Sequence, residues 1–281
     1  MSAGKTTGTL KKIVGALLFV IAILTTCAPL SRAEFQFPLE SISPTTTPSG
    51  EQRFRFGVLY NKNERLLFQK EDRERQVYTL PNLDLSVGVS PDVELLFSYP
   101  FLLINQNDQE QNFGSGDLTI SGVYRIIREG TIFPECAIKF STKLPNADDT
   151  KGFGTDETDF FMGGVFSRKI GPLKLLFNAD LAILGNPDTN QSSQDDVLIY
   201  RVGAIYPLQH NLSAGLEVDG TEFSTRGNDR RFIRGGIAYT WQNLLIDLGG
   251  ALALTEASGE FQVGVGITMK FGIVKEPVYC P

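Results

Sequence analysis

The strongest constraint on the fold is a strict alternation of apolar and polar side chains along residues 173–183. One set of alternating positions is apolar: Leu173, Leu175, Phe177, Ala179, Leu181 and Ile183. The positions between them are mostly polar and include Lys174 and Asp180. Successive side chains of a β-strand point to opposite faces, so this period of two predicts a strand with one apolar face. A turn at 169–172 joins it to a similar segment that begins at Glu157, and the pair is predicted to form a β-hairpin.

The same alternation recurs along most of the chain. Strands are predicted near 53–60, 80–89, 93–101, 117–126, 135–141, 157–168, 173–185, 197–206, 210–221, 230–241, 244–254 and 260–271. Many of them are close to the roughly 9–11 residues that a tilted strand needs to cross a bilayer. Short turns and longer polar connections are predicted to alternate, which is typical of bacterial outer-membrane barrels. The fold class is therefore predicted to be all-β: a transmembrane antiparallel up-and-down β-barrel of about 12 strands.

Closure of the sheet follows from the solvent that such strands would meet. In lipid every backbone N–H and C=O must be paired, and a sheet achieves this only without edges. The apolar face would then meet outer-membrane lipid and the polar face the lumen. The last strand, 261–271, alternates apolar side chains with Gln, Gly, Thr and Lys, and it ends on Phe271. It resembles the C-terminal strand signal that outer-membrane assembly machinery reads, which makes that machinery an expected partner.

The N-terminus has the features of a secretion signal. Basic residues within 1–12 precede an apolar core at 13–24, and small residues at 31–33 suit cleavage after Ala33. Lipoprotein processing at Cys27 is the alternative. We therefore expect a signal peptide at 1–33, a flexible periplasmic lead-in at 34–50, an outer-membrane barrel at 51–272 and a periplasmic tail at 273–281. The expected location is the outer membrane of a Gram-negative bacterium.

Charge argues against nucleic acid as a partner. The chain has a formal net charge of -6, and the predicted signal carries 4 basic and no acidic residues, so its removal gives -6 minus 4, or -10. Nucleic-acid binding depends on Lys and Arg against phosphate, which this balance does not favour. No nucleotide-binding loop or other cofactor motif is present in the sequence, so no cofactor is expected.

Charged residues on the polar face of the predicted strands are candidates to line the lumen. They are Arg53, Arg55, Asp84, Glu94, Asp117, Arg125, Glu135, Lys139, Asp159, Lys174, Asp180, Arg201, Glu217, Asp219, Arg234, Asp247 and Lys270. The two signs are nearly balanced, whereas strongly ion-selective pores carry rings of one sign. Two interpretations stay open: a polar conduit, and a salt-bridged interior without a through-path.

Catalytic and metal-binding residues are not expected. His210 is the single histidine and falls at a predicted periplasmic turn, whereas barrel hydrolases and proteases need theirs near the outer leaflet or outside. The acidic loop 145–156 lacks the spacing of a calcium-binding loop, and we predict a solvated loop there. Cys136 falls on the lipid-facing side and Cys280 in the tail, so a disulfide between them would need a bulge or a folded-back tail.

A family resemblance centres on the segment before the opening hairpin. The runs 143–145 (Lys-Leu-Pro), 152–155 (Gly-Phe-Gly-Thr) and 158–160 (Thr-Asp-Phe) resemble the K-x-P…G-x-G-T…x-D-F signature of predicted outer-membrane barrels named for the meta-pathway of phenol degradation. The resemblance implies uptake of small, often aromatic or hydrophobic, molecules, without identifying the solute.

The leading functional hypothesis is a passive outer-membrane channel for small molecules. The alternative is a barrel that does not transport and serves a structural or surface-binding role, and a barrel enzyme is the third possibility. The predicted topology gives opposite expectations for substitutions at two adjacent residues. Phe177→Arg should cost roughly 2–4 kcal/mol if Phe177 faces lipid near the midplane, whereas Asn178→Arg should be tolerated in a watery lumen.

Overall fold

The computed structural model describes residues 39–64, 75–106, 111–186, 193–224 and 228–272. The predicted signal peptide at 1–33 and the predicted tail at 273–281 lie outside these residues. None of the helices in the described ranges is long and apolar enough to span a membrane.

Strands account for most of the described chain. They are β1 (Gln52–Lys62), β2 (Arg75–Ser90), β3 (Val93–Gln106), β4 (Asn112–Ser115), β5 (Thr119–Ile127), β6 (Glu135–Lys143), β7 (Asp159–Ile170), β8 (Leu173–Asn186), β9 (Ser193–Pro207), β10 (Leu212–Phe223), β11 (Arg230–Trp241), β12 (Leu244–Ala253) and β13 (Phe261–Phe271). Two short 3-10 helices, η1 (Asp149–Lys151) and η2 (Glu256–Ser258), lie in connections. Each predicted strand is present, and β2 and β9 begin earlier than predicted.

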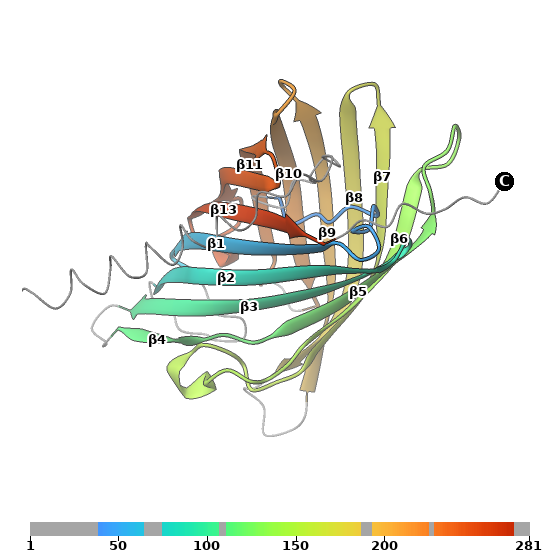
Figure 1. Ribbon diagram of the computed structural model, residues 1–281. Coiled ribbons are helices and arrows are strands. Elements are labelled where there is room, and N and C mark those ends of the chain that lie inside the picture. Colours follow the sequence, from blue (N-terminus) through green and yellow to red (C-terminus); the bar gives the residue numbers. More distant parts are fainter. Residues whose placement is uncertain (1–38, 65–74, 107–110, 187–192, 225–227, 273–281) are drawn as a thin grey trace, which may run out of the picture. The chain divides into compact units, whose positions relative to one another are not determined.

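The strands form one antiparallel sheet that closes on itself (Figure 1). Neighbours in the chain are neighbours in the sheet, and β1 pairs with β13 in unbroken register from Gln52–Phe271 to Lys62–Phe261. Short β4 and longer β5 both pair with β3, so together they make one wall position. The fold is thus a closed antiparallel β-barrel of 12 strands, which confirms the predicted fold class.

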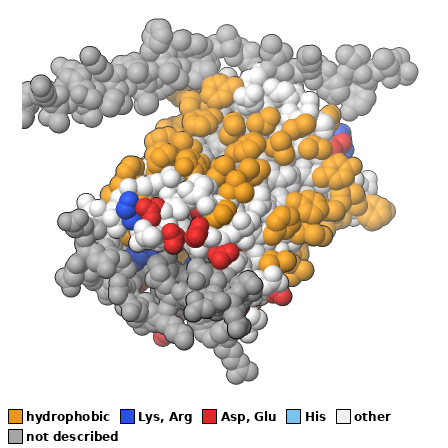
Figure 2. Space-filling model, turned by 90° about the horizontal axis from the view of Figure 1, so that it is seen from below, with side chains coloured by type: hydrophobic (Ala, Val, Ile, Leu, Met, Phe, Trp, Pro, Cys, Tyr) orange, Lys and Arg blue, Asp and Glu red, His pale blue; other side chains and the backbone are white. Residues whose placement is uncertain are grey.

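Exposure along β8 follows the predicted alternation. Phe177 and Leu181 point outward, with 44% and 69% of their surface exposed, whereas Asn178 and Asp180 between them are 0% and 1% exposed. Apolar side chains from the other strands also gather on the outer face, where Figure 2 shows them covering much of the view. An apolar outside and a polar inside is the reverse of a water-soluble β-fold.

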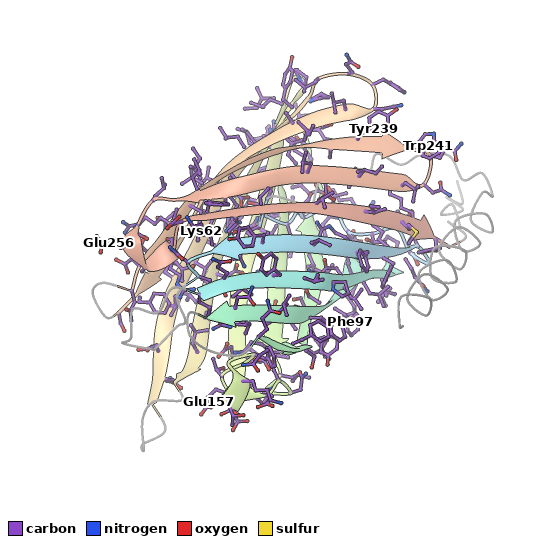
Figure 3. The ribbon with its side chains drawn as sticks, turned by 90° about the vertical axis from the view of Figure 1, so that its left-hand side faces the viewer. Lys62, Phe97, Glu157, Tyr239, Trp241 and Glu256 are labelled. Carbon is purple, nitrogen blue, oxygen red and sulfur yellow. The ribbon has the colours of Figure 1, made fainter. Side chains whose placement is uncertain are left out.

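The two ends of the barrel differ in their connections. Tyr239 and Trp241 lie at the end of the barrel where the connections are short, and Lys62 and Glu256 lie at the opposite end (Figure 3). The tightest connections are the two-residue turns Pro91–Asp92, Gly171–Pro172 and Gln242–Asn243. Gly171 has a φ of 58°, a conformation that glycine adopts without strain at a hairpin turn.

One predicted tight turn is longer than expected. The sequence suggested a turn at 128–130, but the connection between β5 and β6 extends to Pro134. The Arg168 side chain, on β7, holds this loop by donating hydrogen bonds to the carbonyl oxygens of Gly130, Thr131 and Phe133, at 2.7 to 2.8 Å. Short and long connections therefore do not alternate strictly.

Candidate functional site

All the charged residues predicted to face the lumen lie on the interior side of the sheet and none is exposed. Most are buried: Arg53, Arg55, Glu94, Asp117, Glu135, Asp159, Asp180, Glu217, Asp219, Arg234 and Asp247. The rest are partly buried: Asp84, Arg125, Lys139, Lys174, Arg201 and Lys270. The structure brings many of them into ion pairs, and Asp180, for example, receives both Lys139 and Arg201 at 2.8 Å. Their contribution to a solute path stays a prediction.

The N-terminal lead-in runs through the barrel interior. Residues 39–50, called the strap from here on, were expected to form a flexible periplasmic segment; the prediction was wrong for these residues, and 34–38 lie outside the described ones. Glu217 on β10 accepts hydrogen bonds from the backbone N–H groups of Glu40 (2.8 Å) and Ser41 (3.0 Å). Asn178 on β8 pairs with both backbone polar groups of Ile42. Interior side chains thus form the hydrogen bonds that a neighbouring strand would normally form with the backbone groups of the strap.

Hydroxyl groups fix the second half of the strap. Thr45 donates to the Glu135 carboxylate (2.7 Å), Thr47 donates to Glu94, and Lys174 donates to the Ser43 hydroxyl (2.8 Å). The strap then joins the wall where the Gly50 N–H donates to the Gly88 carbonyl oxygen (2.9 Å). The Pro, Ser and Thr content, which suggested flexibility, instead supplies side chains that bond to interior carboxylates.

Apolar packing supports the same placement. Leu39 packs inside the barrel with Leu176, Ala238 and Leu245. Ile42 packs against a second interior cluster centred on Val123. These contacts explain why several inward-facing positions are apolar although the face is mainly polar: they receive the strap.

The loop between β6 and β7 folds over the end of the barrel where the longer connections lie. Phe153 is buried and packs against Val77 and Ile104, which point to the interior from β2 and β3. Arg75 donates to the carbonyl oxygen of Gly152 at 2.7 Å. The predicted solvated loop at 145–156 is therefore only partly correct, since Asp148 and its neighbours are exposed but Phe153 is not. Among the described residues, no group of acidic, His or Cys side chains could hold a metal ion.

Lys143 ties this loop to the wall. Its ammonium lies 2.7 Å from the Asp159 carboxylate, 3.5 Å from that of Asp117 and 2.8 Å from the Thr155 hydroxyl. A Cβ on Gly154 would lie 2.7 Å from an Asp117 carboxylate oxygen, which explains why glycine suits this position. Lys143, Thr155 and Asp159 of the K-x-P…G-x-G-T…x-D-F pattern thus form one bonded assembly.

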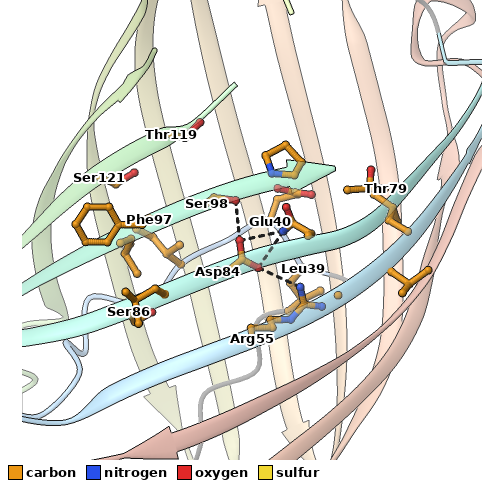
Figure 4. Close-up of a pocket in the computed structure, with 18 of the residues that line it drawn as sticks. Leu39, Glu40, Arg55, Thr79, Asp84, Ser86, Phe97, Ser98, Thr119 and Ser121 are labelled. Carbon is orange, nitrogen blue, oxygen red and sulfur yellow. Dashed lines mark hydrogen bonds and ion pairs between the residues drawn. The ribbon is translucent and has the colours of Figure 1, made fainter. Parts of the chain in front are cut away.

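A cavity of about 510 Å³ lies between the strap and the wall formed by β1, β2, β3 and β5. Figure 4 shows Arg55, Asp84 and Ser98 together on this wall, with Leu39 and Glu40 of the strap close by. Hydroxyl groups are frequent in the lining, including Thr79, Ser86, Ser98, Thr119 and Ser121. This volume lies within the range of small-molecule sites, and the lining mixes apolar side chains with a few charged ones.

The Asp84 carboxylate is the best-bonded polar group on this wall. It receives the Ser98 hydroxyl at 2.6 Å, the Asn82 amide at 2.9 Å and the Arg55 guanidinium at 3.3 Å. The other terminal nitrogen of Arg55 donates to Asp247 at 2.9 Å. The sequence placed Arg55, Asp84 and Asp247 in the interior, but it did not indicate that they meet or that the strap completes the cavity.

His210 and the cysteines do not belong to this site. His210 is exposed in the short connection between β9 and β10, where the sequence placed it. The Cys136 thiol donates to the Pro134 carbonyl oxygen at 3.5 Å, at the start of β6. Cys280 lies outside the described residues, so its pairing with Cys136 stays open.

Comparisons with known proteins define the fold. No family model and no curated protein sequence matches the chain. An outer-membrane channel from Pseudomonas putida F1 superposes with a TM-score of 0.65 at 12% identity, over 85% of this chain and 100% of that one. The translocator domain of the autotransporter NalP from Neisseria meningitidis gives 0.49 at 11% identity, over 95% and 98%. The toluene transporter TbuX from Ralstonia pickettii gives 0.41 at 9% identity, over 84% and 100%.

The comparisons show the fold and assign the chain to no named family. The Pseudomonas putida barrel shares the fold, and at 12% identity the likeness shows the fold alone. The resemblance to barrels named for phenol degradation has no matching family model behind it, so that assignment stays a prediction.

Proposed function

We propose that the chain is a bacterial outer-membrane channel that passes small molecules by passive diffusion along the space between the strap and the wall. The observation that carries the proposal is the cavity of about 510 Å³ inside a closed barrel. The apolar outer face is suited to lipid, and a closed sheet leaves no unpaired edge in a bilayer. The Pseudomonas putida barrel of the same fold is an outer-membrane channel, which supports this function and location.

The solute class is proposed from the lining and the sequence resemblance together. The cavity lining combines hydroxyl groups with apolar side chains, which favours small molecules with a polar group on an apolar body. The resemblance to phenol-pathway barrels points to aromatic members of that class. We propose no enzymatic activity, because the single histidine lies exposed in a turn away from the cavity.

A barrel that does not transport is the second candidate. The observation that favours it is the strap, which occupies interior space and is bonded to Glu217, Asn178, Glu135 and Glu94. An interior filled by bonded chain is typical of small barrels without a water-filled path. In this case the outer surface and the loops would carry the function.

Proteoliposome swelling separates the two candidates. Purified barrel in liposomes should give swelling in arabinose, an uncharged polar solute, and single-channel conductance in planar bilayers. The Asn178→Ala variant, which loosens the strap, should raise the arabinose rate several-fold, and Asn211→Ala in an exposed turn should not. If wild type and both variants were as tight as protein-free liposomes, the channel proposal would be wrong and the structural barrel favoured.

A further inference from the structure

The charged residues that line or adjoin the cavity are mostly acidic, although the interior charges as a whole are nearly balanced. Acidic groups gather on the strap and on β2, β10 and β12: Glu40, Asp84, Glu217, Asp219 and Asp247. Arg55 and Arg234 are the basic residues bonded to them. The bases farther round the wall have acidic partners of their own: Arg125 pairs with Glu135, Lys139 and Arg201 pair with Asp180, and Lys143 pairs with Asp159 and Asp117. The formal charge of the acidic group, counted over these described residues, is -3, from five acids and two bases.

Both arginines of this group are buried and engaged. Arg55 has 9% of its side chain exposed, and its two terminal nitrogens bond to Asp84 and Asp247. Arg234 bonds to Asp219 and to the Gln262 side-chain oxygen. Because these guanidinium groups already serve interior carboxylates, a solute in the cavity meets little of their charge.

Two of the acids, Glu40 and Asp84, are more accessible than the two arginines. The Glu40 side chain is 49% exposed and lines the cavity, and its ion pair with Arg234 is long at 3.5 Å. The Asp84 side chain is 26% exposed and lines the same cavity. Behind them, the Asp247 side chain is 0% exposed, and its Oδ2 accepts no hydrogen bond from the described residues. This wall is therefore short of positive charge.

We propose that the cavity is a cation-selective site, which favours solutes carrying an ammonium group over those carrying a carboxylate or sulfonate. Charges interact more strongly in a confined interior than in bulk water, so a local acid excess discriminates between solutes of opposite sign. Glu40 is the group that meets the cationic head, and Asp84 with Asp247 supplies the surrounding negative field. The apolar body of the solute packs against Leu39 and Leu102.

The inference rests on the proposed channel function, and two permanently charged aromatic probes test it. Trimethylphenylammonium and benzenesulfonate are similar in size and differ in sign. In swelling assays on the full-length barrel, the cation should enter roughly five- to tenfold faster than the anion. A KCl gradient across a planar bilayer should give a zero-current potential of the sign expected for cation preference.

Glu40→Gln should bring the ratio of the two rates down to about two or less, and it leaves the fold intact because Glu40 is half-exposed. Glu256→Gln, the same change on an exposed residue outside the cavity, should keep the wild-type ratio. Equal rates for the two probes, or an unchanged ratio in Glu40→Gln, would overturn cation selectivity while leaving the channel in place. Barrels impermeable to arabinose and to both probes would overturn the channel and this inference together.

Discussion

The side-chain amide of Asn178 pairs with both backbone groups of Ile42. The Ile42 N–H donates to Asn178 Oδ1 at 2.8 Å, and Asn178 Nδ2 donates to the Ile42 carbonyl oxygen at 3.0 Å. One side chain of β8 thus does for the strap what a neighbouring strand would do, and it is fully buried while doing so. The expectation that Asn178→Arg would be tolerated is contradicted by this packing, because an arginine would have to displace the strap.

Asn178→Ala should release the strap locally. The change leaves a buried N–H and a buried C=O of Ile42 without partners, at a cost of about 1–3 kcal/mol for each group that water does not reach. Glutamyl endopeptidase should then cut the purified barrel after Glu40 faster than in wild type. Asn211→Ala, in an exposed turn, is the matched control and should be cut at the wild-type rate. Equal protection of Glu40 in all three proteins would show that this pair does not hold the strap.

Periodicity predicted the wall of the barrel but not its contents. A period of two is local, so Phe177 and Leu181 could be assigned outward and Asp180 inward from the sequence alone. The strap has no such period, and its bonds join residues far apart in the chain: Asn178 comes 136 positions after Ile42, and Glu217 comes 177 positions after Glu40. Only the closed sheet brings these partners together.

The sequence also did not predict that the loop 144–158 folds inward. Phe153 lies between two glycines in a polar stretch. Its partners Val77 and Ile104 belong to β2 and β3, which are separated from this loop in the chain by β5 and β6. The K-x-P…G-x-G-T…x-D-F pattern includes residues that are bonded to one another in the structure, but the sequence could not show these bonds. The pattern coincides with the bonds of Lys143, which join a strand end, a loop hydroxyl and two carboxylates.

Lys143→Met should destabilise this assembly. Removing the ammonium leaves the buried Asp117 and Asp159 carboxylates uncompensated, and breaking a buried pair costs roughly 3–5 kcal/mol. The expected readouts are a lower temperature for the heat-dependent gel shift and faster hydrogen exchange in 144–158. Lys151→Met changes the same residue type in the adjoining loop, at an exposed pair with Asp148 that solvent screens, so it should change stability little. If the two variants unfolded alike, the bonds of Lys143 would not stabilise the barrel.

Phe177→Arg tests whether the apolar belt meets lipid. At the bilayer midplane an outward arginine costs roughly 2–4 kcal/mol, and near the interface about 0–1 kcal/mol. Phe133 is also exposed, but it lies in the connection between β5 and β6, so Phe133→Arg is the matched control. Folding free energies measured in lipid bilayers should separate the two variants by at least about 1 kcal/mol. A barrel surrounded by water would tolerate both changes equally.

Asp92, in the turn between β2 and β3, gives the barrel a contribution to stability that is lost in acid. Desolvation alone would raise the pKa of this carboxyl, but hydrogen bonds from Arg128 and Arg125 outweigh it and hold the pKa below the ordinary value of 3.8. A carboxyl with a depressed folded pKa stabilises the fold above its unfolded pKa, and the contribution disappears as the pH falls through the folded pKa.

Asp92→Asn should therefore unfold at a lower temperature than wild type at pH 6, and the difference should shrink below about pH 4. The effect should be modest, because the Asp92 side chain is 39% exposed and solvent screens the pairs. Asp149→Asn, on an exposed loop carboxyl, should follow wild type across the range. A difference for Asp92→Asn that stayed constant from pH 6 to pH 3 would show that its ionic bonds to the arginines are not the cause.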